Sequence, residues 1–232
     1  RWGTPFTASI AVTGKGLVYV DDSGRPMMLP GLAPGAAFDN RKEGFTLTRS
    51  GETEFIVEWR DGSTDKFVRT PSADSWLPHG YEGVNAMRLG GEPLIAQRYT
   101  LSRVQGRDGR GISIDRFPEA EPGQVLIRVR SDEGQLIEAM RDEPPQLSAD
   151  ESSEPIRIGR VEEVRSNGTR LCHVRYEYAA EAAAALPRDC AGALPTRYNL
   201  VRQTNLVGSE RRYEYRHHLL TSYTTYTGFA HI

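Results

Sequence analysis

The chain has 232 residues, of which 38% are hydrophobic and 26% charged, and its net charge is −2. This length can bury a core as one large or two small domains. The near-neutral charge gives no electrostatic case for nucleic-acid binding. No apolar run approaches the ~20 residues needed to span a bilayer. Positive charge is almost entirely arginine, which suits pairing with carboxylates and stacking on the 10 tyrosines.

Turn signals recur along the chain between short β-rich runs. The flanking runs, at residues 17–20, 45–48, 55–59 and 125–130, are rich in β-branched and aromatic residues. Asx-Gly pairs supply the positive φ angles of tight hairpins. The signals are Asp22-Ser23-Gly24, Ser50-Gly51, Asp61-Gly62, Asp108-Gly109, Asp132-Glu133-Gly134 and Asn167-Gly168. The pattern predicts an all-β fold of antiparallel β-hairpin repeats.

Three stretches interrupt this pattern. Residues 71–93 are rich in glycine and proline, and we expect a long loop there that carries Trp76 and His79. Residues 142–155 are acidic, contain two adjacent prolines and are expected to be exposed. Residues 179–186 are alanine-rich and predict a short helix that ends at Pro187 and is inserted between two strands.

The last part of the chain carries a tyrosine motif. Tyr213 and Tyr215 are separated by one residue, so a strand would place both rings on one face. The same spacing occurs upstream at Tyr176 and Tyr178, which suggests a repeated unit. The opposite strand and the next turn of the motif are predicted at Leu220, Thr221 and Gly228.

An isolated hairpin is only marginally stable, and its open edge invites pairing with other chains. Cross-strand pairs contribute only ~0.2–1 kcal/mol each, so hairpins must lie side by side. A ribbon of hairpins, each hydrogen-bonded to the next, solves this problem, and we expect it to form a curved sheet with neighbours at both ends.

The terminal segment resembles the YD repeat of the Rhs family, whose pattern is Tyr-x-Tyr-Asp, then Leu-Thr, then glycine. Arg216 stands at the aspartate position. An ordered series of segments resembles the start of the Rhs shell. These segments lie at residues 2–6, 16–25, 29–35, 43–49, 99–103 and 108–110. The resemblance covers the whole chain, with residues 71–93 and 179–196 matching least.

This resemblance implies a spiral of hairpins that forms a hollow cocoon around a C-terminal toxin, often delivered by type VI secretion. The implied partners are the remaining shell and toxin of the same protein, with a secretion spike protein and a chaperone. No cofactor, nucleic acid or membrane contact is implied. The implied location is the bacterial cytoplasm before secretion, then the target cell or the extracellular space.

The sequence contains no Asp-Pro-x-Gly self-cleavage signature, toxin domain or PAAR-type tip. We therefore expect a fragment from the N-terminal part of the shell. Its expected parts are opening hairpins at 1–70, a loop insertion at 71–93, hairpins at 94–178, an insertion at 179–196 and the YD repeat at 197–232.

Candidate catalytic groups favour structural roles. Asp22-Ser23-Gly24 matches the Asp-Ser/Thr-Gly triplet of aspartic proteases, but that chemistry needs two carboxylates sharing a proton, and the triplet also forms an ordinary turn. His173 is expected in wall packing or in solvent. On a strand, His217 and His218 would point to opposite faces and could not jointly bind a metal. In a turn, a metal site that includes them is conceivable but needs further ligands. We expect no catalytic, cofactor or metal residue and no enzyme activity, with Asp22 as half of a protease dyad as a rival hypothesis.

Two further alternatives stay open. The tyrosine and arginine side chains could bind carbohydrate by stacking, as expected for a cell-surface YD-repeat module. Asn167-Gly168-Thr169 is a glycosylation sequon as well as a favoured turn. Cys172 is expected to be a buried small hydrophobe on one strand face with Val174, and a disulfide between Cys172 and Cys190 is left open.

Overall fold

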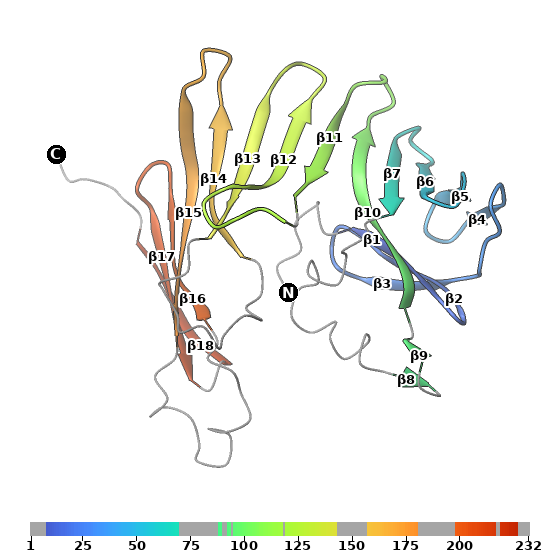
Figure 1. Cartoon of the computed structure of the whole chain (residues 1–232), viewed down its shortest axis with the longest axis horizontal. Helices are drawn as coiled ribbons and strands as arrows, with labels where there is room; N and C mark the ends of the chain where they lie inside the picture. Colours follow the sequence, from blue (N-terminus) through green and yellow to red (C-terminus); the bar gives the residue numbers. More distant parts are fainter. Residues whose placement is uncertain are drawn as a thin grey trace. The chain divides into compact units, whose positions relative to one another are not determined.

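The computed structural model describes residues 8–69, 88–89, 92–93, 95–117, 119–142, 157–180, 198–216 and 219–226. Within these ranges every helix or strand is a β-strand, and none of the described elements is a helix that could cross a membrane. Sixteen strands form an antiparallel sheet that does not close, and two short strands form a separate ladder. The prediction of an all-β fold of antiparallel hairpins is confirmed (Figure 1).

The chain divides into two compact units. Unit 1 comprises residues 1–118 and 128–135, and unit 2 comprises residues 119–127 and 136–232. The strands of unit 1 are β1 (Ser9–Thr13), β2 (Gly16–Val20), β3 (Pro26–Leu29), β4 (Ala37–Asn40), β5 (Phe45–Arg49), β6 (Glu54–Trp59), β7 (Thr64–Arg69), β8 (Arg88–Leu89), β9 (Glu92–Pro93), β10 (Ile95–Gln105) and β11 (Gly111–Arg116). Strand β12 (Val125–Ser131) contributes residues to both units.

The sheet of unit 1 branches at β10. Strands β4 to β7 follow one another in order, and β7 pairs with β10. The other edge of β10 pairs with β1 through residues 95–100 and with β11 through residues 103–105. Strands β2 and β3 continue the β1 branch.

The core of unit 1 lies between the β1–β3 branch and strands β5–β7. The ring of Tyr19 on β2 meets Phe45 at 5.5 Å and Phe67 at 5.9 Å between centroids, both edge to face. Phe55 and Tyr99 meet at 4.7 Å in the same manner. All five side chains are almost completely buried. Such contacts add to the hydrophobic stabilisation from burial of the rings.

Unit 2 is a simple succession of hairpins. Its strands are β13 (Leu136–Arg141), β14 (Ile158–Val164), β15 (Arg170–Ala180), β16 (Tyr198–Asn205), β17 (Glu210–Arg216) and β18 (Leu219–Tyr226). Each strand pairs antiparallel with the next one in the chain. Among the described strands, β18 has a neighbour on one edge only, which is β17.

All six predicted turn signals lie between consecutive strands, where hairpin turns were expected. The glycine has a φ near +80° to +90° in five of them, and the exception is Gly51. The alanine-rich prediction is wrong at its start, because Ala179 and Ala180 belong to β15; residues 181–197 lie outside the described part. The loop predicted at 71–93 contains the β8–β9 ladder, and Trp76 and His79 lie outside the described residues.

Candidate functional site

The turn between β2 and β3 is organised by Asp21. Its Oδ1 accepts hydrogen bonds from the backbone N–H of Ser23 at 3.0 Å and of Arg25 at 2.9 Å, and from the Ser23 hydroxyl at 2.5 Å. Its Oδ2 accepts from Arg25 Nε at 3.1 Å. Burial works to raise the pKa of Asp21, but these hydrogen bonds outweigh it and hold the pKa below its ordinary value.

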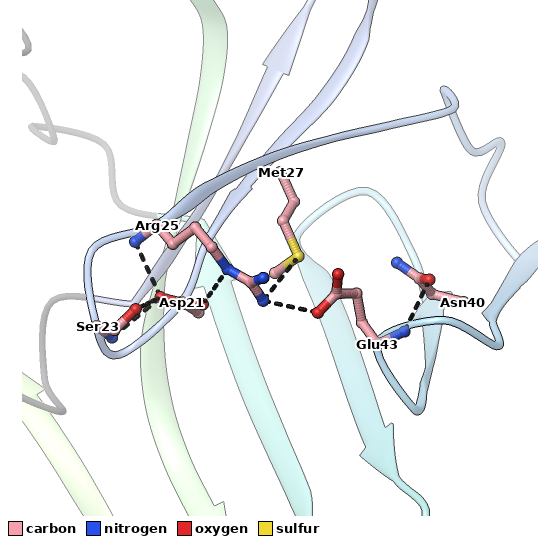
Figure 2. A network of polar contacts seen from close by, with 6 residues as sticks. All are labelled: Asp21, Ser23, Arg25, Met27, Asn40 and Glu43. Carbon is pink, nitrogen blue, oxygen red and sulfur yellow. Dashed lines mark hydrogen bonds and ion pairs between the residues drawn. The ribbon is translucent and has the colours of Figure 1, made fainter.

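Arg25 connects this turn to the hairpin of β4 and β5. Figure 2 shows its guanidinium between the carboxylates of Asp21 and Glu43, with Arg25 Nη2 2.7 Å from Glu43 Oε2. The backbone N–H of Glu43 donates in turn to Asn40 Oδ1 at 3.3 Å. The network therefore ties two turns that lie eighteen residues apart in the sequence and gives each carboxylate a structural role.

Asp22, the residue that matched the protease triplet, is exposed at the same turn. No hydrogen bond joins it to another carboxylate among the described residues. A proton-sharing dyad needs two carboxyl groups in direct contact. The described geometry therefore favours the turn interpretation of Asp22-Ser23-Gly24.

Asp22 does border an open concavity in unit 1, with a volume of roughly 560 Å³. Within its lining, Trp59 Nε1 donates to Asp65 Oδ2 at 2.8 Å. Burial raises the pKa of Asp65 most, the bond from Trp59 opposes this, and the nearby charges of Asp22 and Asp61 raise it further. Among the described residues, no group of three or more His, Cys, Asp or Glu is arranged to hold a metal ion.

In unit 2 the four predicted tyrosines come together. Tyr213 and Tyr215 on β17 are half-buried. Arg212 and Glu214, which alternate with them along the strand, are exposed, as the two-residue period of a β-strand predicts. Burial raises the pKa of Tyr176, and the neighbouring hydroxyl of Tyr213 adds to this shift. Burial also raises the pKa of Tyr178, and the nearby Tyr176 and Tyr215 hydroxyls add to this shift. The Tyr178 hydroxyl donates to Ile158 O at 2.9 Å.

The register extends this aromatic surface across β16 and β18. Gln203 lies opposite both Tyr176 and Arg211, Arg211 lies opposite Thr225, and Tyr213 lies opposite Tyr223. Residues opposite one another in a ladder point to the same side. We call this surface the tyrosine face; it comprises Tyr176, Tyr178, Gln203, Arg211, Tyr213, Tyr215, Tyr223 and Thr225.

The opposite side of the same strands carries a network of ion pairs. Arg202 pairs with Glu177 on β15, and its Nη1 lies 3.7 Å from Glu210 Oε2. Arg212 pairs with Glu210 and stacks over Tyr226, with 5.1 Å from its Cζ to the ring centroid. The two faces of this part of unit 2 are thus chemically distinct.

A concavity of about 320 Å³ lies at one end of the tyrosine face. Its lining is polar and comes from β16, β17, their connecting turn and β18, namely Gln203, Asn205, Ser209, Glu210, Arg211 and Thr225. Asn205 Oδ1 accepts from the backbone N–H of Val207 at 3.2 Å and of Ser209 at 2.8 Å, which fixes its amide at the turn.

The remaining predicted residues are dispersed. Leu220 lies opposite Tyr215, next to a register irregularity at Thr221, whose hydroxyl donates to Glu214 O at 3.1 Å. His173 Nε2 lies 2.9 Å from Glu163 Oε2 at a partly exposed position, consistent with a structural role. Gly228, His217, His218 and Cys190 lie outside the described residues.

Strand β15 carries a register shift that the sequence prediction did not contain. Cys172 lies opposite Glu162, whereas Val174 lies opposite Val161. Because Glu162 and Val161 are consecutive on β14, Cys172 and Val174 do not share a face, and that prediction is wrong. Cys172 is half-buried with a free thiol, and its Sγ lies 3.6 Å from Val174 O.

Sequence reasoning missed the polar end of the tyrosine face. Its signal was the stretch from Asn205 to Gly208, in which asparagine opens a tight turn and glycine with φ +77° closes it. Recognising that turn would have placed Gln203 opposite Arg211. In comparisons with known proteins, no family model matches the chain and no curated protein matches it significantly.

Proposed function

We propose that this chain is a wall segment of an Rhs-type shell, which confines and protects a C-terminal toxin of the same protein until its delivery by type VI secretion. The role is structural and requires no catalytic group in the wall. The toxin and the rest of the shell would be its direct partners, with a spike protein and a chaperone acting in delivery.

One observation carries the proposal. In unit 2 each strand pairs with the next one in the chain, and the outer edge of β18 has no described neighbour. An unpaired edge presents a row of N–H and C=O groups, which a further strand can satisfy. A sheet that grows in this way is suited to a continuous wall, because every added hairpin both covers an edge and provides a new one.

Side-chain clamps between successive hairpins support a mechanical role. In unit 1, Arg103 on β10 binds both carboxylate oxygens of Asp132, at 3.1 and 2.7 Å. The same carboxylate accepts from the backbone N–H of Gly111 at 2.9 Å. Bidentate arginine–carboxylate pairs fix geometry as well as contributing energy, so these clamps would stiffen a wall.

The test uses the complete reading frame. We expect its translation to continue past this chain into further YD repeats and a variable C-terminal domain. In the purified full-length protein, that domain should resist a protease at concentrations that digest the same domain expressed alone. A stop codon directly after this chain, or equal digestion of the enclosed and isolated domains, would contradict the proposal.

A further inference from the structure

We propose that the open concavity of unit 1 binds a primary alkylammonium group, carried either by a free diamine or by a lysine side chain of a partner protein. This inference goes beyond the shell function. Pairing between strands forms a wall whether or not the concavity holds an amine, and the concavity could bind an amine in a chain that forms no wall.

The first observation concerns the hydroxyl of Tyr19 on β2. Tyr19 is only 1% exposed, yet it lines the concavity, and its hydroxyl makes no hydrogen bond to a described residue. Burial raises the pKa of this hydroxyl most, and the charges of Asp65, Asp21 and Asp22 raise it further. The hydroxyl therefore lies near Asp65 and Asp22, which line the same concavity. A buried polar group without a hydrogen-bond partner is costly, and a ligand in the concavity would supply the missing partner.

Tyr99 on β10 gives the comparison within the same unit. Its ring is fully buried like that of Tyr19, but its hydroxyl lies 2.7 Å from Glu52 O and 2.8 Å from Gln97 Oε1. Two tyrosines buried in one unit thus differ in their hydrogen bonding. The one that lacks a partner among the described residues is the one that borders the concavity.

The second observation concerns the carboxylate of Asp65 on β7. Its Oδ2 accepts from Trp59 Nε1 at 2.8 Å, whereas no described residue donates to its Oδ1. Asp65 is half-buried, and burial disfavours its ionised form. A cation in the concavity would offset this penalty. An ammonium has three N–H donors, which Asp65 Oδ1 and the Tyr19 oxygen can accept, because a phenolic hydroxyl accepts as well as donates.

The charge of the lining favours a cation over an anion. The acidic residues that line the concavity are Asp22, Glu43, Asp61 and Asp65, and the basic one is Arg60. Glu43 is paired with Arg25, but neither Asp22 nor Asp61 makes an ion pair with another described residue. The remaining carboxylates outnumber the guanidinium of Arg60, so the concavity attracts a positively charged ligand.

The rest of the lining suits an alkyl chain. Trp59 and Tyr19 contribute aromatic rings, and Ala8, Leu101 and Val104 contribute apolar side chains. Aliphatic carbons can pack on these groups, and an indole face attracts a cation within about 6 Å of its centroid. A metal ion is a poorer match, because no group of three or more His, Cys, Asp or Glu in the described part of the chain is arranged to hold one.

The probes are cadaverine and a capped tripeptide with one lysine between two glycines. Pentanediol and the norleucine analogue of the tripeptide are their uncharged comparisons. Binding is followed by NMR titration of the isotope-labelled chain in about 150 mM salt, which screens attraction to exposed charges. The indole N–H signal of Trp59 is the local readout, since Asp65 accepts its hydrogen bond.

We expect a saturable shift of this signal with at least one of the two amines. Its uncharged comparison should bind at least ~10-fold more weakly, because it lacks the charged hydrogen bonds to Asp65. Tighter binding of cadaverine would identify a free diamine as the ligand, and tighter binding of the tripeptide would identify a lysine side chain. Either result supports the proposal.

Matched variants locate the site. Tyr19→Phe removes only the hydroxyl and should weaken amine binding about tenfold. Asp65→Asn, which keeps an acceptor for Trp59, should weaken it by a similar factor or more. Tyr99→Phe removes a hydrogen-bonded hydroxyl outside the concavity, and Asp39→Asn removes an exposed charge that does not line it. Both of these controls should leave the affinity within about twofold.

Thermal unfolding of the unliganded variants provides a second readout. Tyr99→Phe should lower the melting temperature, because a satisfied hydrogen bond is lost, whereas Tyr19→Phe should not lower it. Circular dichroism of each variant should match that of the parent chain. The proposal is overturned if neither amine binds, if the uncharged comparisons bind equally well, if Tyr19→Phe and Asp65→Asn leave the affinity unchanged, or if Asp39→Asn weakens binding as much as Asp65→Asn.

Discussion

Glu138 on β13 and Glu162 on β14 lie directly opposite each other, and both side chains are buried, at 3% and 8% exposure. Like charges in this position repel each other. Arg170 resolves the conflict, because its Nη2 binds Glu138 while its Nε lies 2.7 Å from Glu162 Oε2. Arg160 Nε adds a second bond to Glu162 at 2.7 Å. One arginine thus bridges two opposed carboxylates in the sheet of unit 2.

Removing that arginine should destabilise unit 2 strongly. Arg170→Gln would remove the guanidinium that bridges two buried, opposed carboxylates, and we expect a loss of about 3 kcal/mol in the free energy of unfolding. Urea denaturation checks this. Arg165→Gln is the matched control, because Arg165 is exposed and its ion pair with Glu163 is long, at 3.7 Å. This variant should lose less than about 0.5 kcal/mol in the free energy of unfolding. Equal losses in the two variants would show that the buried pair is not stabilised in this way.

Asp65 should give stability an unusual dependence on pH. Its folded-state pKa is raised above 3.8, so the folded chain binds its proton more tightly than the unfolded chain does. Stability from this group is therefore present below pH 3.8 and is lost as pH rises through the folded-state pKa. Asp65→Asn keeps an acceptor for Trp59 and removes the buried charge. We expect the variant to be more stable than the parent at pH 7 and similar to it near pH 3, as measured by thermal unfolding across this range.

A lower stability of the Asp65→Asn variant at pH 7 would contradict this account. Glu162 acts in the opposite direction. Burial alone would raise its pKa, but the bonds from Arg170 and Arg160 lower it below 4.5. Its contribution is present above pH 4.5 and is lost as pH falls through the folded-state value. The effect of Asp65 is therefore measured as the difference in stability between the Asp65→Asn variant and the parent chain at each pH.

Asp21 and Asp22 are neighbours with different expected roles. Asp21→Ala removes the acceptor for two backbone N–H groups, a hydroxyl and a guanidinium, and should cost about 2 kcal/mol. Asp22→Ala removes an exposed side chain and should change stability by less than about 0.5 kcal/mol. Paired denaturant titrations check both values. A large loss for Asp22→Ala would contradict its expected role as an exposed turn residue. Abolition of a measured self-cleavage by Asp22→Ala would instead support the protease hypothesis.

The hairpins were predictable from the sequence because turn chemistry is local. Asp61-Gly62 or Asn167-Gly168 specifies its turn through a positive φ that few other residues adopt. The faces of the strands were less predictable, because one extra residue reverses the alternation. The register shift in β15 separates Cys172 from Val174, and on β12 the buried residue is Leu126 and not its alternating neighbours Val125 and Ile127.

Contacts between distant parts of the chain lay beyond any local pattern. The tie between Arg25 and Glu43 joins the β2–β3 turn to the β4–β5 hairpin. The bridge from Arg170 to Glu138 depends on the register of β13, β14 and β15. The branch at β10 has the same origin, since one long strand must be read together with three partners. The tyrosine pairs were found because each pair lies within one strand. Their union into one face required the pairing of β15, β16 and β17.

The most direct test of the wall concerns the outer edge of β18. Asn205 N–H donates to Ser209 O at the end of the β16–β17 hairpin, and hydrogen-bonded pairs alternate along antiparallel ladders, so the amides of Tyr223 and Thr225 point away from β17. Residue-resolved hydrogen exchange should find these two amides unprotected in the 232-residue chain and protected in the product of the complete reading frame. Fast exchange of both amides in the longer product would contradict a wall that continues by backbone pairing at this edge.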